Sequence, residues 1–156
     1  MKVVYVETSA ALRAILETGT TPEIEDTIIE ADRLVTSRLS LVESARAFLR
    51  LRLLGEVPEE KLARLKAEAD DLWAHCDIWE LTPEVCDVAG SLESDAFLRT
   101  LDALHLATFL RAQRDLEDLK VLLTVDDRLV RAVEYQRSLA GGSGPEDPGS
   151  ADPGVG

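Results

Sequence analysis

The sequence alternates short apolar runs with longer amphipathic stretches, and this alternation restricts the possible fold more than any other feature. Four runs rich in Val, Leu and Ile have the length of buried strands, and each connection between them can hold at least one helix. Such an order predicts an α/β fold with a parallel sheet, because parallel strands need a long crossover connection. The expected strands are residues 3–6, 34–37, 76–81 and 120–125.

The stretches between these runs carry helix start signals and helical spacing. Thr-Pro-Glu occurs twice, and it places a threonine at the N-cap and a proline at the first helical position. Other stretches space apolar residues at three and four, as amphipathic helices do. We expect helices within residues 10–16, 21–32, 40–54, 57–75, 82–94, 100–114 and 127–136.

The chain has the length and composition of one folded domain followed by a tail. Its 156 residues are 46% hydrophobic but only 4% aromatic, so the core must be built mainly from Leu, Val, Ala and Ile. Residues 1–140 are expected to form a single domain. Residues 141–156 are Gly, Pro, Ser and acid without periodicity, which predicts a disordered tail.

The sequence predicts a cytoplasmic protein with reduced thiols. No apolar run approaches the roughly 18 residues that span a bilayer, and a strand pattern beginning at residue 3 leaves no room for a signal peptide. Cys76 and Cys86 form no disulfide framework and are expected to be buried small hydrophobes.

The net charge of −13 bears on the possible partners. It works against electrostatic capture of nucleic acid and favours basic proteins or divalent cations. It does not exclude a nucleic-acid enzyme, because bound metal ions can supply positive charge locally.

Four acids stand near the expected ends of strands or the starts of the following helices. In open parallel sheets these positions converge on the ligand crevice. Carboxylates gathered there repel one another, and Mg²⁺ or Mn²⁺ would neutralise them because hard cations prefer oxygen ligands. Such ions could activate water against a phosphodiester. The four acids are Glu7 after the first strand, Glu43 in the first turn of its helix, Asp102 at the start of an apolar helix and Asp126 at the end of the fourth strand.

Each acid also has a local explanation, which stays open at this point. Glu43 and Ser40 have the spacing of a capping box. Asp102 can face the dipole of its own helix, with Thr100 as the cap. The remaining acids can also be satisfied locally, Glu7 by neighbouring backbone N–H groups and Asp126 or Asp127 as an N-cap.

Other polar and aromatic residues are read first as structural. His105 lies three residues after Asp102 and is expected to be a packed core histidine, with support of the acids as the alternative. His75, Cys76 and Cys86 fit no zinc spacing. Trp73 and Trp79 are expected in the core or an interface, while Arg46, Arg50 and Arg52 form either a solvated face or an RNA phosphate contact.

The segments "VVYVETSAALRAIL", "TSRLSLVESARAF", "RTLDALHLAT" and "LLTVDDRLVRA" resemble, in order and spacing, the four signature segments of PIN-domain ribonucleases. The likeness is greatest to VapC-type toxins of bacterial toxin–antitoxin pairs and covers about residues 3–134. It implies an α/β/α sandwich around a parallel sheet of four or five strands. It also implies divalent-metal-dependent RNA cleavage that leaves 5′-phosphate and 3′-hydroxyl ends, a homodimer, and a neutralising cognate antitoxin.

The resemblance assigns the catalytic and metal-binding roles to the same four acids, Glu7, Glu43, Asp102 and Asp126. Thr8, Ser9 and Thr124 match hydroxyls that would orient carboxylates or water behind them. From its place near the first acid, Arg13 is expected to contact a phosphate or a carboxylate.

One residue departs from the family pattern. The first acid is usually Asp, and Glu7 is longer by one methylene. Because Mg²⁺ tolerates little error in its geometry, the chain is read as a metal-dependent endoribonuclease toxin or, alternatively, as a weak or inactive PIN-fold binding module. The acidic surface is expected to suit a basic antitoxin segment, with an Arg inserted among the acids.

Overall fold

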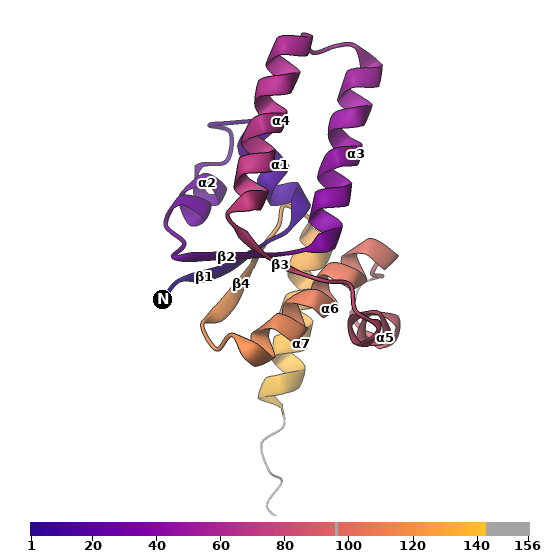
Figure 1. Ribbon diagram of the computed structural model, residues 1–156. Helices are drawn as coiled ribbons and strands as arrows, with labels where there is room; N and C mark the ends of the chain where they lie inside the picture. Colours follow the sequence, from indigo (N-terminus) through magenta and orange to yellow (C-terminus); the bar gives the residue numbers. More distant parts are fainter. Residues whose placement is uncertain (96, 143–156) are drawn as a thin grey trace, which may run out of the picture.

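The computed structural model describes residues 1–95 and 97–142, and its centre is a four-stranded parallel sheet. The strands are β1 (Val3–Val6), β2 (Arg33–Ser37), β3 (Cys76–Trp79) and β4 (Leu119–Leu123). They lie in the order β3-β2-β1-β4 (Figure 1). All three pairings are parallel, so the carboxyl ends of the strands meet at one edge of the sheet.

Seven helices complete the described part of the chain, and both faces of the sheet are covered. Their bounds are α1 (Thr8–Leu16), α2 (Pro22–Ile29), α3 (Arg38–Leu54), α4 (Glu59–Ala74), α5 (Pro83–Ser91), α6 (Thr100–Asp115) and α7 (Asp127–Gly141). The predicted α/β/α sandwich around a parallel sheet is confirmed, with four strands in the described residues.

The alternation of side chains along β1 produces the two layers. Val3 and Tyr5 point to one face, where they pack with Leu106 and Phe109 of α6 and with residues of α7. Val4 and Val6 point to the other face, against α1 and Trp73 of α4. A strand buried on both faces reads as a continuous apolar run, which is why "VVYV" shows no polar alternation.

Helices α3 and α4 form an antiparallel pair that extends beyond the sheet (Figure 1). Phe48 of α3 packs with Ile15 of α1 and with Leu62 and Ala69 of α4 in a small separate core. Gly55 ends α3 in the left-handed conformation at φ 66°, which glycine adopts without the steric cost of a side chain.

Several local predictions need correction. Helix α3, which follows β2, begins at Arg38 and not at the predicted Ser40. The Ser37 side chain accepts a hydrogen bond from the Leu39 amide, so Ser37 is the N-cap. The capping box of Ser40 and Glu43 is therefore wrong, and Glu43 lies in the second turn. Thr100 is the first residue of α6 rather than its cap.

The cysteines differ from each other in burial. Cys76 is buried, as predicted, and burial raises its thiol pKa to about 12, which keeps it protonated. Cys86 is exposed, so the prediction of a buried residue is wrong there. Helix α7 continues to Gly141, one residue beyond the predicted domain end, and residues 143–156 of the predicted tail lie outside the described residues.

None of the helices in residues 1–95 and 97–142 is long and apolar enough to cross a bilayer.

Candidate active site

The predicted acids come from four segments near the carboxyl ends of the strands. Glu7 directly follows β1 and is the N-cap of α1. Asp126 lies three residues beyond β4, which ends at Leu123, and is the N-cap of α7. Glu43 comes from α3 and Asp102 from the first turn of α6. The structure arranges them as two pairs, each held by a different partner.

Glu7 is held through one of its two oxygens. Its Oε2 accepts hydrogen bonds from the Ser9 amide at 3.1 Å, from Thr124 Oγ1 at 2.8 Å and from the Ser9 hydroxyl. The hydroxyl oxygens of Thr124 and Ser9 also lie 3.1 Å apart. Because Thr124 directly follows β4, these contacts connect Glu7 to the end of that strand. Glu7 is only 7% exposed, and its Oε1 lies 3.7 Å from Nε2 of His105.

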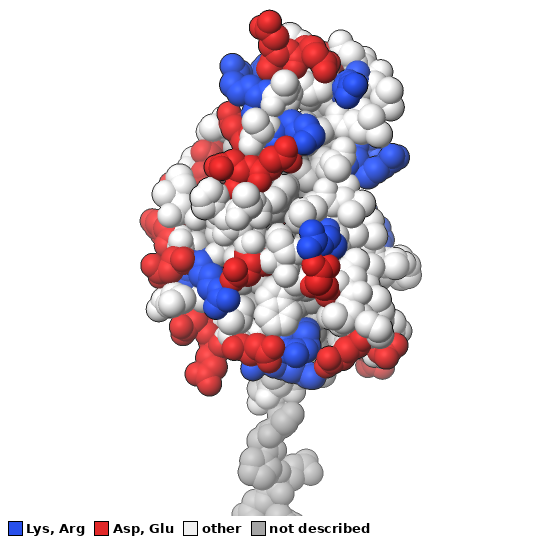
Figure 2. All heavy atoms as spheres, in the orientation of Figure 1, with Lys and Arg blue, Asp and Glu red and all other residues white. Residues whose placement is uncertain are grey.

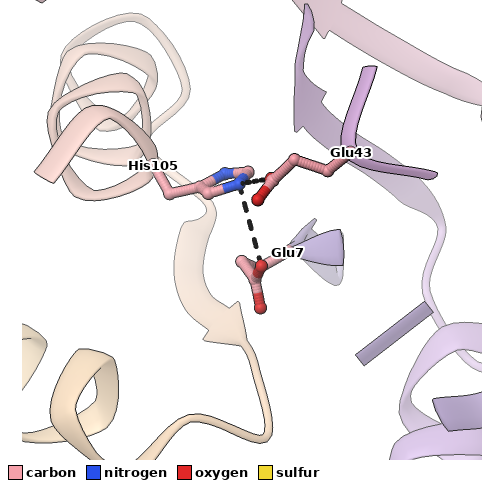
Figure 3. Close-up of side chains that lie close together, drawn as sticks. All are labelled: Glu7, Glu43 and His105. Atoms are coloured by element: carbon pink, nitrogen blue, oxygen red, sulfur yellow. Dashed lines mark hydrogen bonds and ion pairs between the residues drawn. The ribbon is translucent and has the colours of Figure 1, made fainter. Parts of the chain in front are cut away.

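Glu43 approaches Glu7 through the same histidine. Its Oε1 accepts from Thr8 Oγ1 at 2.8 Å and lies 2.5 Å from His105 Nε2 (Figure 3). Burial alone would raise the pKa of Glu43, but the hydrogen bond to His105, followed by the hydrogen bond from Thr8 and the charge of Arg99, outweighs burial and lowers that pKa. Glu43 is therefore ionised at neutral pH.

His105 is the residue whose role the sequence understated. It is 1% exposed, as a core histidine would be, yet Nε2 faces both glutamates and Nδ1 lies 2.9 Å from the Tyr5 hydroxyl. Burial and the charge of Glu7 raise the pKa of Tyr5 well above its usual value, so its hydroxyl stays protonated and can donate to Nδ1. The ring proton is then on Nε2, which donates a hydrogen bond to Oε1 of Glu43.

The lowered pKa of Glu43 predicts a pH dependence of stability. A carboxyl whose pKa is lower in the folded state than the unfolded value of 4.5 stabilises the fold above that value. This contribution is lost as the pH falls through the folded pKa. Denaturant unfolding between about pH 3 and 6 should show a shallower loss of free energy for Glu43→Gln than for the unchanged protein.

Glu30 provides the control for this measurement. Its pKa is also lowered, by the hydrogen bond and charge of Lys2, but it is exposed to solvent. Because solvent screens exposed ion pairs, Glu30→Gln should change the acid limb less than Glu43→Gln. Equal slopes for the two variants would contradict the role of His105 at Glu43.

Asp102 and Asp126 form the second pair, joined by Arg99. Nε of Arg99 lies 2.9 Å from Oδ2 of Asp102, and Nη2 lies 3.4 Å from Oδ1 of Asp102 and 2.8 Å from Oδ2 of Asp126. Oδ1 of Asp126 accepts from the Arg128 amide at 2.9 Å, as an N-cap does. The local capping explanation thus holds for Asp126, and its other oxygen contacts Arg99.

The carboxylate side chains at this site are of the type that binds divalent cations. A carboxylate oxygen of Glu7, one of Glu43 and a ring nitrogen of His105 lie within 4.8 Å of one another, so the two carboxylates are close enough to share one ion beside the protonated Nε2 of His105. Both hydrogen bonds recorded for Glu43 in the described chain end on Oε1, and the three donors to Glu7 use Oε2. One oxygen of each glutamate is therefore open to an ion. Asp102 and Asp126 offer further oxygens only if Arg99 leaves them.

Arg13 lies apart from this network of contacts. It forms an ion pair with Glu17 one turn further along α1, and its Nη1 is 3.4 Å from Thr21 Oγ1. The carboxylate it contacts is thus Glu17 rather than one of the four acids, and the phosphate contact stays a prediction.

Comparisons with known proteins decide the family. The family model described as PIN domain matches residues 4–135. The chain belongs to the PIN-domain family. The resemblance of its four segments is thereby confirmed, and the site described above lies at the carboxyl ends of the strands of a PIN fold.

One sequence relative and two solved structures are similar to this PIN domain. It is 33% identical over 129 residues to Ribonuclease VapC46 of Mycobacterium tuberculosis, covering 83% of this chain and 88% of that protein. The crystal structure of PAE2754 from Pyrobaculum aerophilum matches with a TM-score of 0.57, 19% identity and 90% of each chain. VapBC2 from Rickettsia felis, solved with a DNA fragment from its promoter, matches with a TM-score of 0.52 and 11% identity over 76% of this chain and 96% of that one. The two structures support the fold alone.

Proposed function

We propose that this PIN domain is a divalent-metal-dependent endoribonuclease that acts as a VapC-type toxin. The observation that carries the proposal is the meeting of Glu7 and Glu43, 36 positions apart in sequence, around His105. Structural acids that only capped helices would have no reason to share one buried histidine. The relative named Ribonuclease VapC46 supports RNA as the substrate.

Each residue near the site has a distinct proposed role. Glu7 and Glu43 would hold Mg²⁺ or Mn²⁺ through their open oxygens, with Asp102 and Asp126 completing the set. The bound cation would lower the pKa of a water and neutralise charge on the phosphodiester. Ser9 and Thr124 orient Glu7, while Thr8 and His105 orient Glu43, so neither carboxylate needs to reorganise.

The surface charge suits recognition of RNA through the metal site rather than through a basic surface. Acidic and basic side chains are interspersed over the described part of the face drawn in Figure 2, and no extended basic area covers it. With a net charge of −13, phosphate contacts would depend on the cation.

A groove beside the site is the proposed docking surface for a cognate antitoxin. It has a volume of about 840 Å³ and runs along α3, with Glu43 among the residues that line it. Val42 and Leu53, which also line it, are 54% and 79% exposed. An antitoxin segment with apolar side chains and a basic residue would cover the groove and reach the acids. A homodimer is proposed from the resemblance alone.

The first test is cleavage of single-stranded and structured RNA by the purified chain. We expect cleavage with Mn²⁺ or Mg²⁺, products with 5′-phosphate ends, and loss of cleavage when EDTA removes the metal. Cleavage that persists at the same rate in EDTA would contradict the proposed mechanism.

The alternative is a binding module in which the acids serve structure, and the capping contacts of Glu7 and Asp126 favour it. Glu7→Asp separates the two functions. Aspartate at an N-cap can still accept from the Ser9 amide, and it matches the usual family residue, so an enzyme should keep or raise its cleavage rate. The same background in the unchanged chain, Glu7→Asp and Asp102→Asn would indicate the binding module.

A further inference from the structure

Arg99 is the basic side chain placed among the predicted acids. Its guanidinium contacts both Asp102 and Asp126. Its charge also acts on Glu43, where it contributes to the lowered pKa. Together with the Arg128 amide, Arg99 occupies all four carboxylate oxygens of the two aspartates. One side chain thus stands where two of the four acids would face a cation.

Helix capping does not explain the position of Arg99. It occupies the N-cap of α6, where Ser, Thr, Asp and Asn are preferred, and its side chain makes no capping hydrogen bond. A positive charge at a helix N-terminus is unfavourable to the helix dipole. The side chain is 55% exposed, so packing does not hold it either. The attraction that remains is the one to Asp102 and Asp126.

We propose that Arg99 is an internal counter-ion that neutralises Asp102 and Asp126 in the metal-free protein and is displaced when a divalent cation binds. This inference rests on the proposed metal-dependent function and concerns how its site is regulated. Arg99 is a positioning residue, since it acts through the two aspartates. Because the guanidinium and the cation compete for the same oxygens, Arg99 sets the affinity of the site for metal.

The exposed side chain makes displacement feasible without rearrangement of the fold. Arg99 can swing toward solvent, whereas Glu7 and Glu43 are held by Ser9, Thr124, Thr8 and His105 and stay in place. The glutamate pair would therefore receive the ion first, and the aspartates would join it once Arg99 has left.

The test compares Mn²⁺ binding by calorimetry and melting temperature for metal-stripped wild type, Arg99→Gln, Arg99→Lys and Arg33→Gln. Arg99→Gln should bind Mn²⁺ on the order of tenfold more tightly, because the ion no longer displaces a charged competitor. Its melting temperature without metal should fall by roughly 2–4 °C, because the acids then repel one another. Arg99→Lys keeps the charge and should bind Mn²⁺ nearly as the wild type does.

Arg33→Gln is the matched control. Arg33 is similarly exposed and paired with Asp77, but it lies at the start of β2, the opposite end of the strand from the site. It should leave Mn²⁺ affinity unchanged. Equal Mn²⁺ affinity in wild type and Arg99→Gln, with RNA cleavage intact, would overturn the counter-ion role alone. Absence of Mn²⁺ binding in both would overturn the metal site and, with it, this inference.

Discussion

Replacing Asp102 with asparagine is expected to lower the rate of metal-dependent RNA cleavage by about 100-fold or more. The side chain is only 11% exposed, and its two oxygens face Arg99 rather than any backbone amide at the start of α6. Asparagine preserves the shape but removes the charge that a cation needs, and the loss of a ligand oxygen weakens both metal binding and rate. Cleavage should be measured at saturating Mn²⁺ with circular dichroism as a check of folding.

Asp115→Asn is the control for that experiment. It makes the same substitution on the same helix, but Asp115 is the last residue of α6, where it pairs with Arg111 at 2.9 Å. Its cleavage rate should stay within about twofold of the wild type. A folded Asp102→Asn protein that cleaves RNA as fast as Asp115→Asn would remove Asp102 from the site.

The second large effect is expected at His105. His105→Leu should destabilise the protein by about 2–4 kcal/mol, because it removes two hydrogen bonds inside the fold, one with the buried Tyr5 hydroxyl and one with the charged Glu43. RNA cleavage should fall roughly 10- to 100-fold, since Glu43 loses the group that orients it. Urea unfolding and cleavage assays on the same preparations measure both effects.

Tyr5→Phe tests the hydrogen bond at the other end of the network, between Tyr5 and His105. It removes the hydroxyl from the chain Tyr5–His105–Glu43 but leaves the contact between His105 and Glu43 intact. We expect a cost of about 1–2 kcal/mol and a smaller loss of cleavage than in His105→Leu. If both variants lose activity only in proportion to stability, His105 would be a packing residue after all.

Much of the fold was predictable because its signals are local. The apolar run at β1, the repeated Thr-Pro-Glu openings and the helical spacing of α4 and α6 each depend on neighbouring residues, and all correspond to observed elements. Helix starts depend on more than the local sequence. Ser37 and Ser40 both have side chains that can cap a helix, and only the backbone leaving β2 selects Ser37.

The composition of the site was only partly predictable. The positions of Glu7 and Glu43 near strand ends predict that they belong to the site, and the structure brings them together. His105 had one usable signal, its spacing of three residues from Asp102 on α6, but the same spacing is typical of core residues. Arg99 carried no signal, because a basic residue before a helix is read as surface.

The sequence by itself determined the succession of strands and helices along the chain, the family and the residue types available for a metal site. The tertiary structure alone decided which of those residues meet. His105 lies 62 positions from Glu43, and Arg99 lies 27 positions from Asp126. Contacts over such separations depend on how the helices pack on the sheet, whereas helix and strand signals arise from interactions within a few residues.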